Sequence, residues 1–191
     1  MRAARLTGFS DGVIAIAITI MVLELRLPAG SDSTSLLARL PVFFSYVLSF
    51  IYLGIYWSNH HNLFQAVKRV NGAVLWANLH LLFWLTLVPF TTAWMGENHF
   101  AAWPTAVYGI VLLLAGFAYY ILARVLVAVH GSSSGLARAL GHQFKDKLSV
   151  LLYAVAIPLA FAYSWAADAL YVTVAIMWLI PDRRFEKSIV P

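Results

Sequence analysis

The chain has 191 residues, of which 62% are hydrophobic and 11% are charged; its mean hydropathy is +0.80 and its formal net charge is +5. Soluble domains carry about 25% charged residues, so this composition predicts an integral membrane protein of the all-α class. The lack of cysteine excludes disulfides, thiolate metal sites and cysteine nucleophiles. The basic residues are scattered over loops, which argues against a nucleic-acid partner.

Six apolar segments follow one another along the chain, and we expect six transmembrane helices in a single domain over residues 1–191. The segments cover residues 6–27, 40–64, 73–95, 104–129, 148–163 and 166–180. The second, third and fourth reach the ~20 residues that a spanning helix needs. The fifth and sixth are shorter and nearly continuous, which predicts a tight helical hairpin. Pro89 and Pro158 lie inside helices and predict kinks.

The basic residues also predict which ends of the helices face the cytoplasm. With the N-terminus inside, only Arg26 and Arg39 fall on the outer side. The cytoplasmic side then holds Arg2, Arg5, Lys68, Arg69, Arg124, Arg138, Lys145, Lys147, Arg183, Arg184 and Lys187. This asymmetry follows the positive-inside rule. It predicts a multi-pass protein of the cell (inner) membrane with both termini in the cytoplasm.

The first helix combines an apolar stripe with an ionisable group. At about 100° per residue, Ile16, Thr19, Ile20 and Leu23 fall in one sector, and Asp11 points away from it. The stripe either packs against another helix or lipid, or lines a pore closed by symmetry, with Asp11 buried against neighbouring helices. In a narrow pore, the Thr19 hydroxyl would help an ion to shed water, and the apolar rings would gate by dewetting.

The second and third helices place polar side chains at similar depths. Trp57, His60 and His61 lie near the inner end of the second helix, and Asn78 and His80 lie on the third. Membrane bundles routinely use such groups as a network that fastens helices together. The alternative is a haem or metal site in which His60 or His61 faces His80.

The first helix carries a further pattern. The run Arg5-Leu-Thr-Gly-Phe9-Ser10-Asp11 matches Arg-x-x-x-Phe-Ser-Asp in full, and it leads into Gly-Val-Ile-Ala-Ile-Ala-Ile-Thr and then Val-Leu-Glu-Leu-Arg-Leu-Pro. This resembles the first helix of the transmembrane protein 175 family of potassium channels in its bacterial form. The resemblance implies a channel whose first helices line the pore of a four-subunit assembly. Because the six-helix unit occurs once here, it implies a homotetramer.

The resemblance also implies roles for individual residues. Ile16 would form the constriction, Thr19 would aid selectivity, and Ile20 and Leu23 would add further apolar rings. A structural network would tie the first helix to the next two through Arg5, Phe9, Ser10, Asp11, Trp57, His60, His61 and Asn78. Arg5 is the partner that the resemblance implies for Asp11. The permeant ion would be K⁺, with no cofactor and no metal.

Several motifs are absent from the sequence. It has no Thr-Val-Gly-Tyr-Gly filter and no voltage-sensing run of arginines. It has no hydrolase triad, His-Glu-x-x-His or phosphate-loop pattern, so we expect no enzyme. Besides the haem or metal protein, a small-solute transporter that uses Asp11 as a proton or sodium site remains an alternative.

Overall fold

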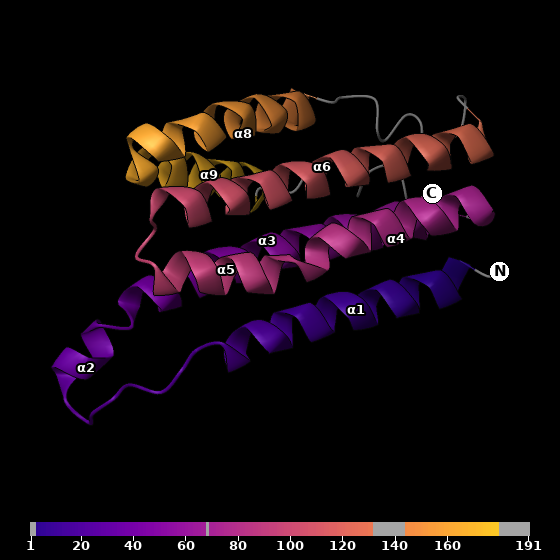
Figure 1. The fold of residues 1–191 in the computed structure, drawn as a ribbon. Helices are drawn as coiled ribbons and strands as arrows, with labels where there is room; N and C mark the ends of the chain where they lie inside the picture. Colours follow the sequence, from indigo (N-terminus) through magenta and orange to yellow (C-terminus); the bar gives the residue numbers. More distant parts are fainter. Residues whose placement is uncertain (1–2, 68, 132–143, 180–191) are drawn as a thin grey trace.

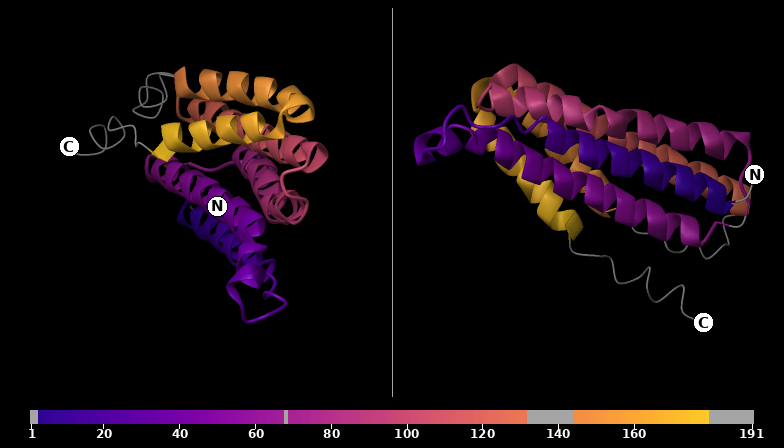
Figure 2. Two further views of the ribbon diagram at one scale, coloured as in Figure 1. Left: turned by 90° about the vertical axis from the view of Figure 1, so that its left-hand side faces the viewer. Right: turned by 90° about the horizontal axis from the view of Figure 1, so that it is seen from below.

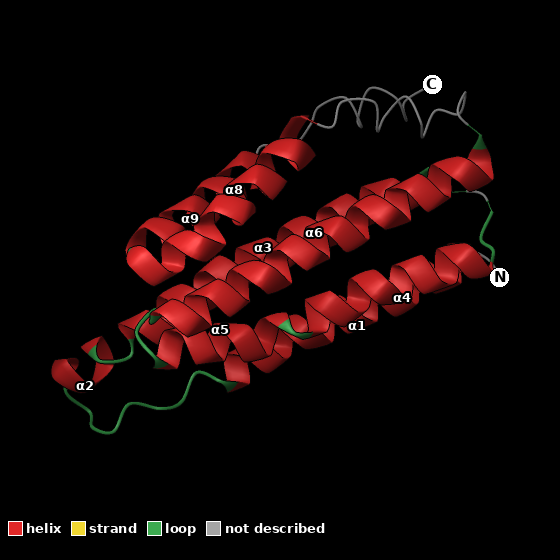
Figure 3. Cartoon of the chain, turned by 45° about the horizontal axis from the view of Figure 1, so that its top comes forward, coloured by secondary structure: helices red, strands yellow, loops and turns green. Residues whose placement is uncertain are grey.

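The computed structural model describes residues 3–67, 69–131 and 144–179, and over these ranges all its regular structure is helical (Figures 1 and 3). The helices are α1 (Ala3–Leu23), α2 (Ser33–Leu37), α3 (Leu40–Gln65), α4 (Gly72–Thr86), α5 (Val88–Glu97), α6 (Ala102–His130), α8 (Phe144–Ala162) and α9 (Ser164–Leu179). The all-α prediction is therefore confirmed for this part of the chain.

Four spans are long and apolar enough to cross a membrane: α1, α3, the α4–α5 pair taken together, and α6. The fifth and sixth predicted segments correspond to α8 and α9. Helix α9 has only 16 residues, and the first turn of α8 contains Lys145, Asp146 and Lys147. Length and composition therefore support four crossings, and the other two remain a prediction.

Helix α1 ends at Leu23, four residues before the predicted boundary at Leu27. The reason lies in the residues that follow. Glu24 and Arg26 favour water over hydrocarbon, and Pro28 disfavours the helical conformation of the residue before it. Leu27 is consequently in the loop, with 88% of its surface exposed.

Pro89 divides the third predicted helix into α4 and α5. Its ring nitrogen has no hydrogen to donate to the carbonyl four residues earlier. The Leu87 N–H instead closes a tight turn with the Trp84 carbonyl, at 3.2 Å. In contrast, Pro158 lies within an unbroken α8. The short α2 was not predicted; Asp32 caps it by accepting a hydrogen bond from the Ser35 N–H at 3.4 Å.

The helices pack around two apolar cores that share α3 and α6. The first core is built by α1, α3, α4 and α6, and includes Ile14, Leu53 and Leu81. The second lies between α3, α6, α8 and α9, and includes Tyr108 and Tyr171. Helix α1 consequently lies at the opposite edge of the bundle from α8 and α9 (Figures 1 and 2).

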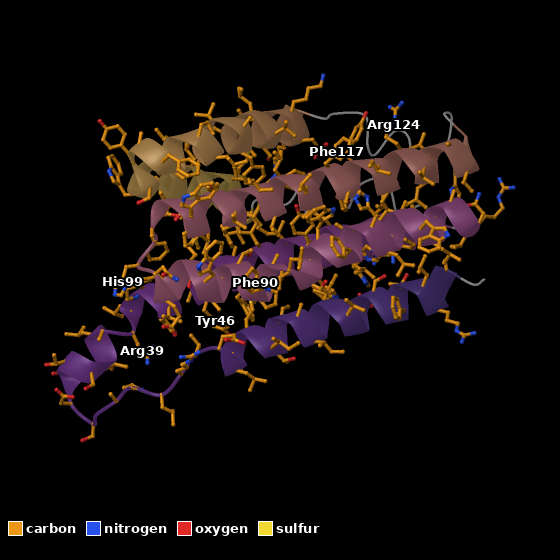
Figure 4. The ribbon with its side chains drawn as sticks, in the orientation of Figure 1. Arg39, Tyr46, Phe90, His99, Phe117 and Arg124 are labelled. Carbon is orange, nitrogen blue, oxygen red and sulfur yellow. The ribbon has the colours of Figure 1, made fainter. Side chains whose placement is uncertain are left out.

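The basic residues separate toward the two ends of the bundle. Arg124 lies toward the end that holds the N-terminus, and Arg39 lies toward the other (Figure 4). Part of the predicted charge asymmetry lies outside the described residues, namely Arg2, Lys68, Arg138, Arg183, Arg184 and Lys187. The orientation in the membrane therefore remains a prediction.

Candidate functional site

Helix α1 presents one face to the protein and leaves the opposite face uncovered. The buried face packs on the first core through Leu6, Ser10, Ile14, Ala17 and Met21. These residues recur every three or four positions, which is the spacing of a single helix face. The opposite arc of α1 is exposed over most of its length within the described part of this chain.

The uncovered arc holds the stripe singled out in the sequence. The exposed fractions are 59% for Ile16, 42% for Ile20 and 77% for Leu23. Thr19 is exposed between them, and its hydroxyl donates to the Ile16 carbonyl at 2.9 Å. A hydroxyl that donates backward in this way keeps its oxygen lone pairs available to another partner.

The same arc continues toward the start of α1. Phe9 is 52% exposed, and Arg5 is also exposed. At about 100° per residue, both project within about 20° of Ile16. Phe9 and Arg5 therefore belong to the uncovered face, and their predicted part in the structural network remains a prediction.

Three fully buried side chains join α1 to α3 and α4. The Ser10 hydroxyl donates to the Leu6 carbonyl at 3.0 Å and accepts from the Asn78 amide nitrogen at 2.9 Å. The Asn78 oxygen lies 2.8 Å from His60 Nε2. Because an amide oxygen only accepts, His60 donates through Nε2. The His60 ring stacks on Phe64, one turn further along α3, with the two ring centroids 4.4 Å apart. The hydrogen bonds from Ser10 through Asn78 to His60 hold this face of α1 against α3 and α4.

Asp11 has a different partner from the expected one. Its carboxylate accepts a hydrogen bond from Trp57 Nε1 at 3.1 Å, and the Trp57 ring stacks on His61 at 5.8 Å. Asp11 is only partly buried, and no ion pair with Arg5 is found among the residues of known placement. Arg5 lies six residues earlier, about 9 Å along the helix axis, on the uncovered face. The described residues therefore show no direct Arg5–Asp11 pair, and a bridge between them through Ser10, Asn78 or a neighbouring subunit remains a prediction.

The histidines on α3 and α4 belong to no group of three or more converging His, Asp and Glu side chains within the described residues. His80 Nε2 accepts from Trp84 Nε1 at 3.0 Å. His61 Nε2 lies 2.9 Å from the Gln65 amide nitrogen, one turn along the same helix. His61 and His80 therefore each have a hydrogen-bond partner within their own helix.

A hollow of about 390 Å³ adjoins the uncovered stripe, and the sequence had not indicated it. Its walls include Ile16 and Ile20 of α1 and Thr86, Pro89 and Phe90 at the α4–α5 break. Phe90 is 62% exposed and projects from α5 on the side of α1 (Figure 4). The proline signalled the break, but a break alone does not reveal which neighbouring helix it faces.

A second group of buried polar side chains was also missed. The Thr92 hydroxyl donates to Ser49 Oγ at 2.6 Å, and Ser49 Oγ lies 3.0 Å from the Tyr108 hydroxyl. These contacts join α5, α3 and α6. The only advance signal was the presence of isolated hydroxyl residues in otherwise apolar helices, a pattern common to helix packing in general.

The comparisons with known proteins agree with this architecture. The family model described as the endosomal/lysosomal potassium channel TMEM175 matches residues 5–89. A potassium channel of Streptomyces collinus is 37% identical over 131 residues, covering 63% of this chain and 62% of that protein. The crystal structure of a lysosomal potassium-selective channel TMEM175 homolog from Chamaesiphon minutus matches with a TM-score of 0.79 and 27% identity, covering 98% of each chain.

One relative matches almost end to end. A potassium channel of Chryseobacterium sp. (strain P1-3) is 53% identical over 189 residues, which is 99% of this chain and 98% of that protein. The alignment therefore includes both α1 with its uncovered stripe and the α8–α9 pair. At this identity and coverage, the chain belongs to the bacterial TMEM175 family of potassium channels.

Proposed function

We propose that the protein is a potassium-permeable, leak-like cation channel whose pore is lined by the uncovered face of α1. The observation that carries this proposal is the exposure of Ile16, Ile20 and Leu23 on a helix whose other face is held by buried hydrogen bonds. The names of its relatives support potassium as the permeant ion.

The stripe supplies two elements that a pore needs. Rings of branched aliphatic side chains such as Ile16 resist wetting and close a narrow passage to ions. Thr19 supplies a hydroxyl oxygen that stabilises an ion as it loses water. The Ser10–Asn78–His60 network holds α1 in register, and we assign it, together with Asp11 and Trp57, a structural role.

A pore lined by one helix per subunit requires several copies of the chain. We infer a homotetramer in the inner membrane, in which the uncovered arc of each α1 faces the symmetry axis. In this arrangement all 191 residues form one six-helix domain, α8 and α9 also cross the membrane, and both termini are cytoplasmic. The exposed aromatic and aliphatic residues on the outer helices would contact lipid.

Current recordings from reconstituted protein in opposing potassium and sodium gradients test the proposal. We expect Ile16→Asn to raise potassium conductance several-fold, because the apolar ring loses its dewetting barrier and gains a hydrogen-bonding lining. Val22→Asn is the matched control. Val22 is 47% exposed on the same helix, but about 120° away from Ile16. Equal currents in the two variants would contradict the pore assignment.

A further inference from the structure

A second cavity, of about 350 Å³, lies between α3, α6, α8 and α9, in the half of the bundle away from α1. Its walls are mainly aromatic and include Tyr52, Tyr56, Phe117, Tyr120, Tyr153 and Trp178. The size and the apolar lining fall within the range of ligand-binding pockets. The proposed pore function leaves this cavity without a role.

The polar atoms of several lining residues are already used inside the protein. The Tyr52 hydroxyl donates to the Tyr171 carbonyl at 2.6 Å, and the Tyr153 hydroxyl donates to Tyr52 at 3.3 Å. Trp178 Nε1 donates to Ser149 Oγ at 2.8 Å. What these side chains present to the cavity is therefore mainly ring surface, which suits a hydrocarbon chain better than a polar solute.

The rim of the cavity is basic. Lys147 and Asp146 both line it. The Lys145 ammonium lies 5.8 Å from the ring centre of Trp178, and the Arg124 guanidinium lies 6.0 Å from that of Tyr120. Among the described residues, the cations Arg124, Lys145 and Lys147 lie on or beside this lining together with the carboxylate Asp146, so this part of the rim favours a negatively charged group.

The rim lies where α8 begins. Helix α8 runs beside only the part of α6 nearer Ala102, so that α6 continues well past the first residues of α8 (Figures 1 and 3). Phe117 and Arg124 both lie along α6 toward the end that extends past α8 (Figure 4). An apolar cavity below a basic rim between transmembrane helices is the arrangement that binds anionic lipid head groups.

We propose that this cavity binds an anionic phospholipid. One acyl chain occupies the aromatic cavity, and the phosphate lies among Arg124, Lys145 and Lys147. Asp146 repels a second negative charge, which favours lipids with a single phosphate over more highly charged ones. The bound lipid fills the space between α3, α6 and the α8–α9 pair, and so completes the packing of this half of the bundle.

Fluorescence quenching in vesicles tests the proposal directly. The full-length protein is reconstituted into phosphatidylcholine containing a small fraction of phosphatidylglycerol, with brominated acyl chains on one lipid or the other. Trp178 lines the cavity, so a bromine in the cavity quenches it. We expect phosphatidylglycerol to quench more strongly than phosphatidylcholine at equal bromine content, and the excess to disappear in Trp178→Phe.

Two variants, each with a control, test the roles of the rim and of the cavity separately. Lys147→Gln should lower the preference for phosphatidylglycerol about fivefold. Its control, Arg5→Gln, removes an exposed cation from α1 and should leave this lipid preference unchanged. Gly116 also lines the cavity, and a Cβ there would lie 3.6 Å from the Tyr56 hydroxyl. Gly116→Leu should abolish the excess quenching by filling the cavity, while Gly54→Leu, at a position where a Cβ meets nothing within 4 Å, should not.

Each contrary result overturns the proposal. Equal quenching by the two lipids would show that the rim does not select an anion. Undiminished quenching in Gly116→Leu would show that no acyl chain enters the cavity. Displacement of the lipid by inorganic phosphate would show that the rim recognises a free anion. Far-ultraviolet circular dichroism and size-exclusion profiles of each variant establish that a lost signal does not come from a lost fold.

Discussion

At the scale of single residues, Thr19 shows how a hydroxyl can serve both a helix and an ion. The Thr19 hydroxyl donates its hydrogen to the Ile16 carbonyl, with the two oxygens 2.9 Å apart. The hydroxyl hydrogen therefore needs no partner from outside the helix. Its oxygen lies on the uncovered stripe with lone pairs that can accept from water or face a cation. Among the four stripe residues, it alone carries a polar side chain.

We therefore expect Thr19→Val to weaken the discrimination between potassium and sodium. Valine keeps the branched shape and nearly the same volume, but it removes the oxygen. The reversal potential, measured with potassium on one side of the membrane and sodium on the other, should move toward zero. The tetramer should remain intact by size-exclusion chromatography. A reversal potential equal to that of the unmodified protein would remove Thr19 from the selectivity mechanism.

Asn78 is the residue on which the joint between three helices depends. It donates to Ser10 on α1 and accepts from His60 on α3. Asn78→Leu would leave the buried His60 Nε2–H without a partner and Ser10 with only its bond to the Leu6 carbonyl, and we expect a loss of about 1–2 kcal/mol of stability. Thermal unfolding in detergent measures it. Asn62→Leu is the control, because Asn62 is partly buried on α3 and has no side-chain hydrogen bond in the described structure; equal losses would argue against a special role for the joint.

At the scale of helices, the predictable features were those that depend on local sequence. Pro89 marks the break between α4 and α5 in the sequence, although Pro158 lies within an unbroken α8. The apolar periodicity of α1 separates its two faces without reference to any neighbour. The partner of Asp11 was not predictable, because Trp57 reaches it from another helix, 46 residues away in sequence. The cavity between α3, α6, α8 and α9 depends on how four helices pack together, so the sequence pattern contains no direct signal for it.

Close helix contacts provide a test at this scale. At Gly96 on α5, a Cβ would lie 2.7 Å from the Val42 Cα of α3 and would also clash with the Ser45 hydroxyl. Because a backbone atom cannot move aside, Gly96→Ala should push α5 away from α3 and cost about 1–3 kcal/mol. Gly54→Ala should instead be neutral or stabilising, since alanine favours a helix and no atom lies within 4 Å. Thermal unfolding of the two variants would show opposite shifts; a shift of the same sign would contradict the packing of α5 on α3.

At the scale of the whole molecule, the two cores give the halves of the bundle different tasks. The first core fixes one face of α1 and leaves the other exposed, and the proposed assembly directs that exposed face toward other copies of the chain. The second core holds α8 and α9 on the far side, where they cannot contribute to a pore lined by α1. Helices α3 and α6 belong to both cores and so connect the two halves of the bundle.

The lack of native cysteine makes the proposed assembly testable with single-cysteine variants. Ile16 is 59% exposed, whereas Ile14, two residues earlier, is 1% exposed and packs inside its own subunit.

If the α1 helices surround a narrow axis, Ile16→Cys brings thiols from different subunits close together. A disulfide needs Cα atoms about 4.4–6.8 Å apart, so mild oxidation in vesicles should convert the 21.2 kDa chain into a band of twice that mass on a non-reducing gel. Ile14→Cys should remain monomeric on the same gel, because its side chain is buried in the first core of its own subunit. Cross-linking of both variants to the same extent would point to random collision in the membrane. Failure of Ile16→Cys to cross-link in vesicles that still conduct potassium would place the stripe away from the axis, and the pore would then have to be sought at another face of the bundle.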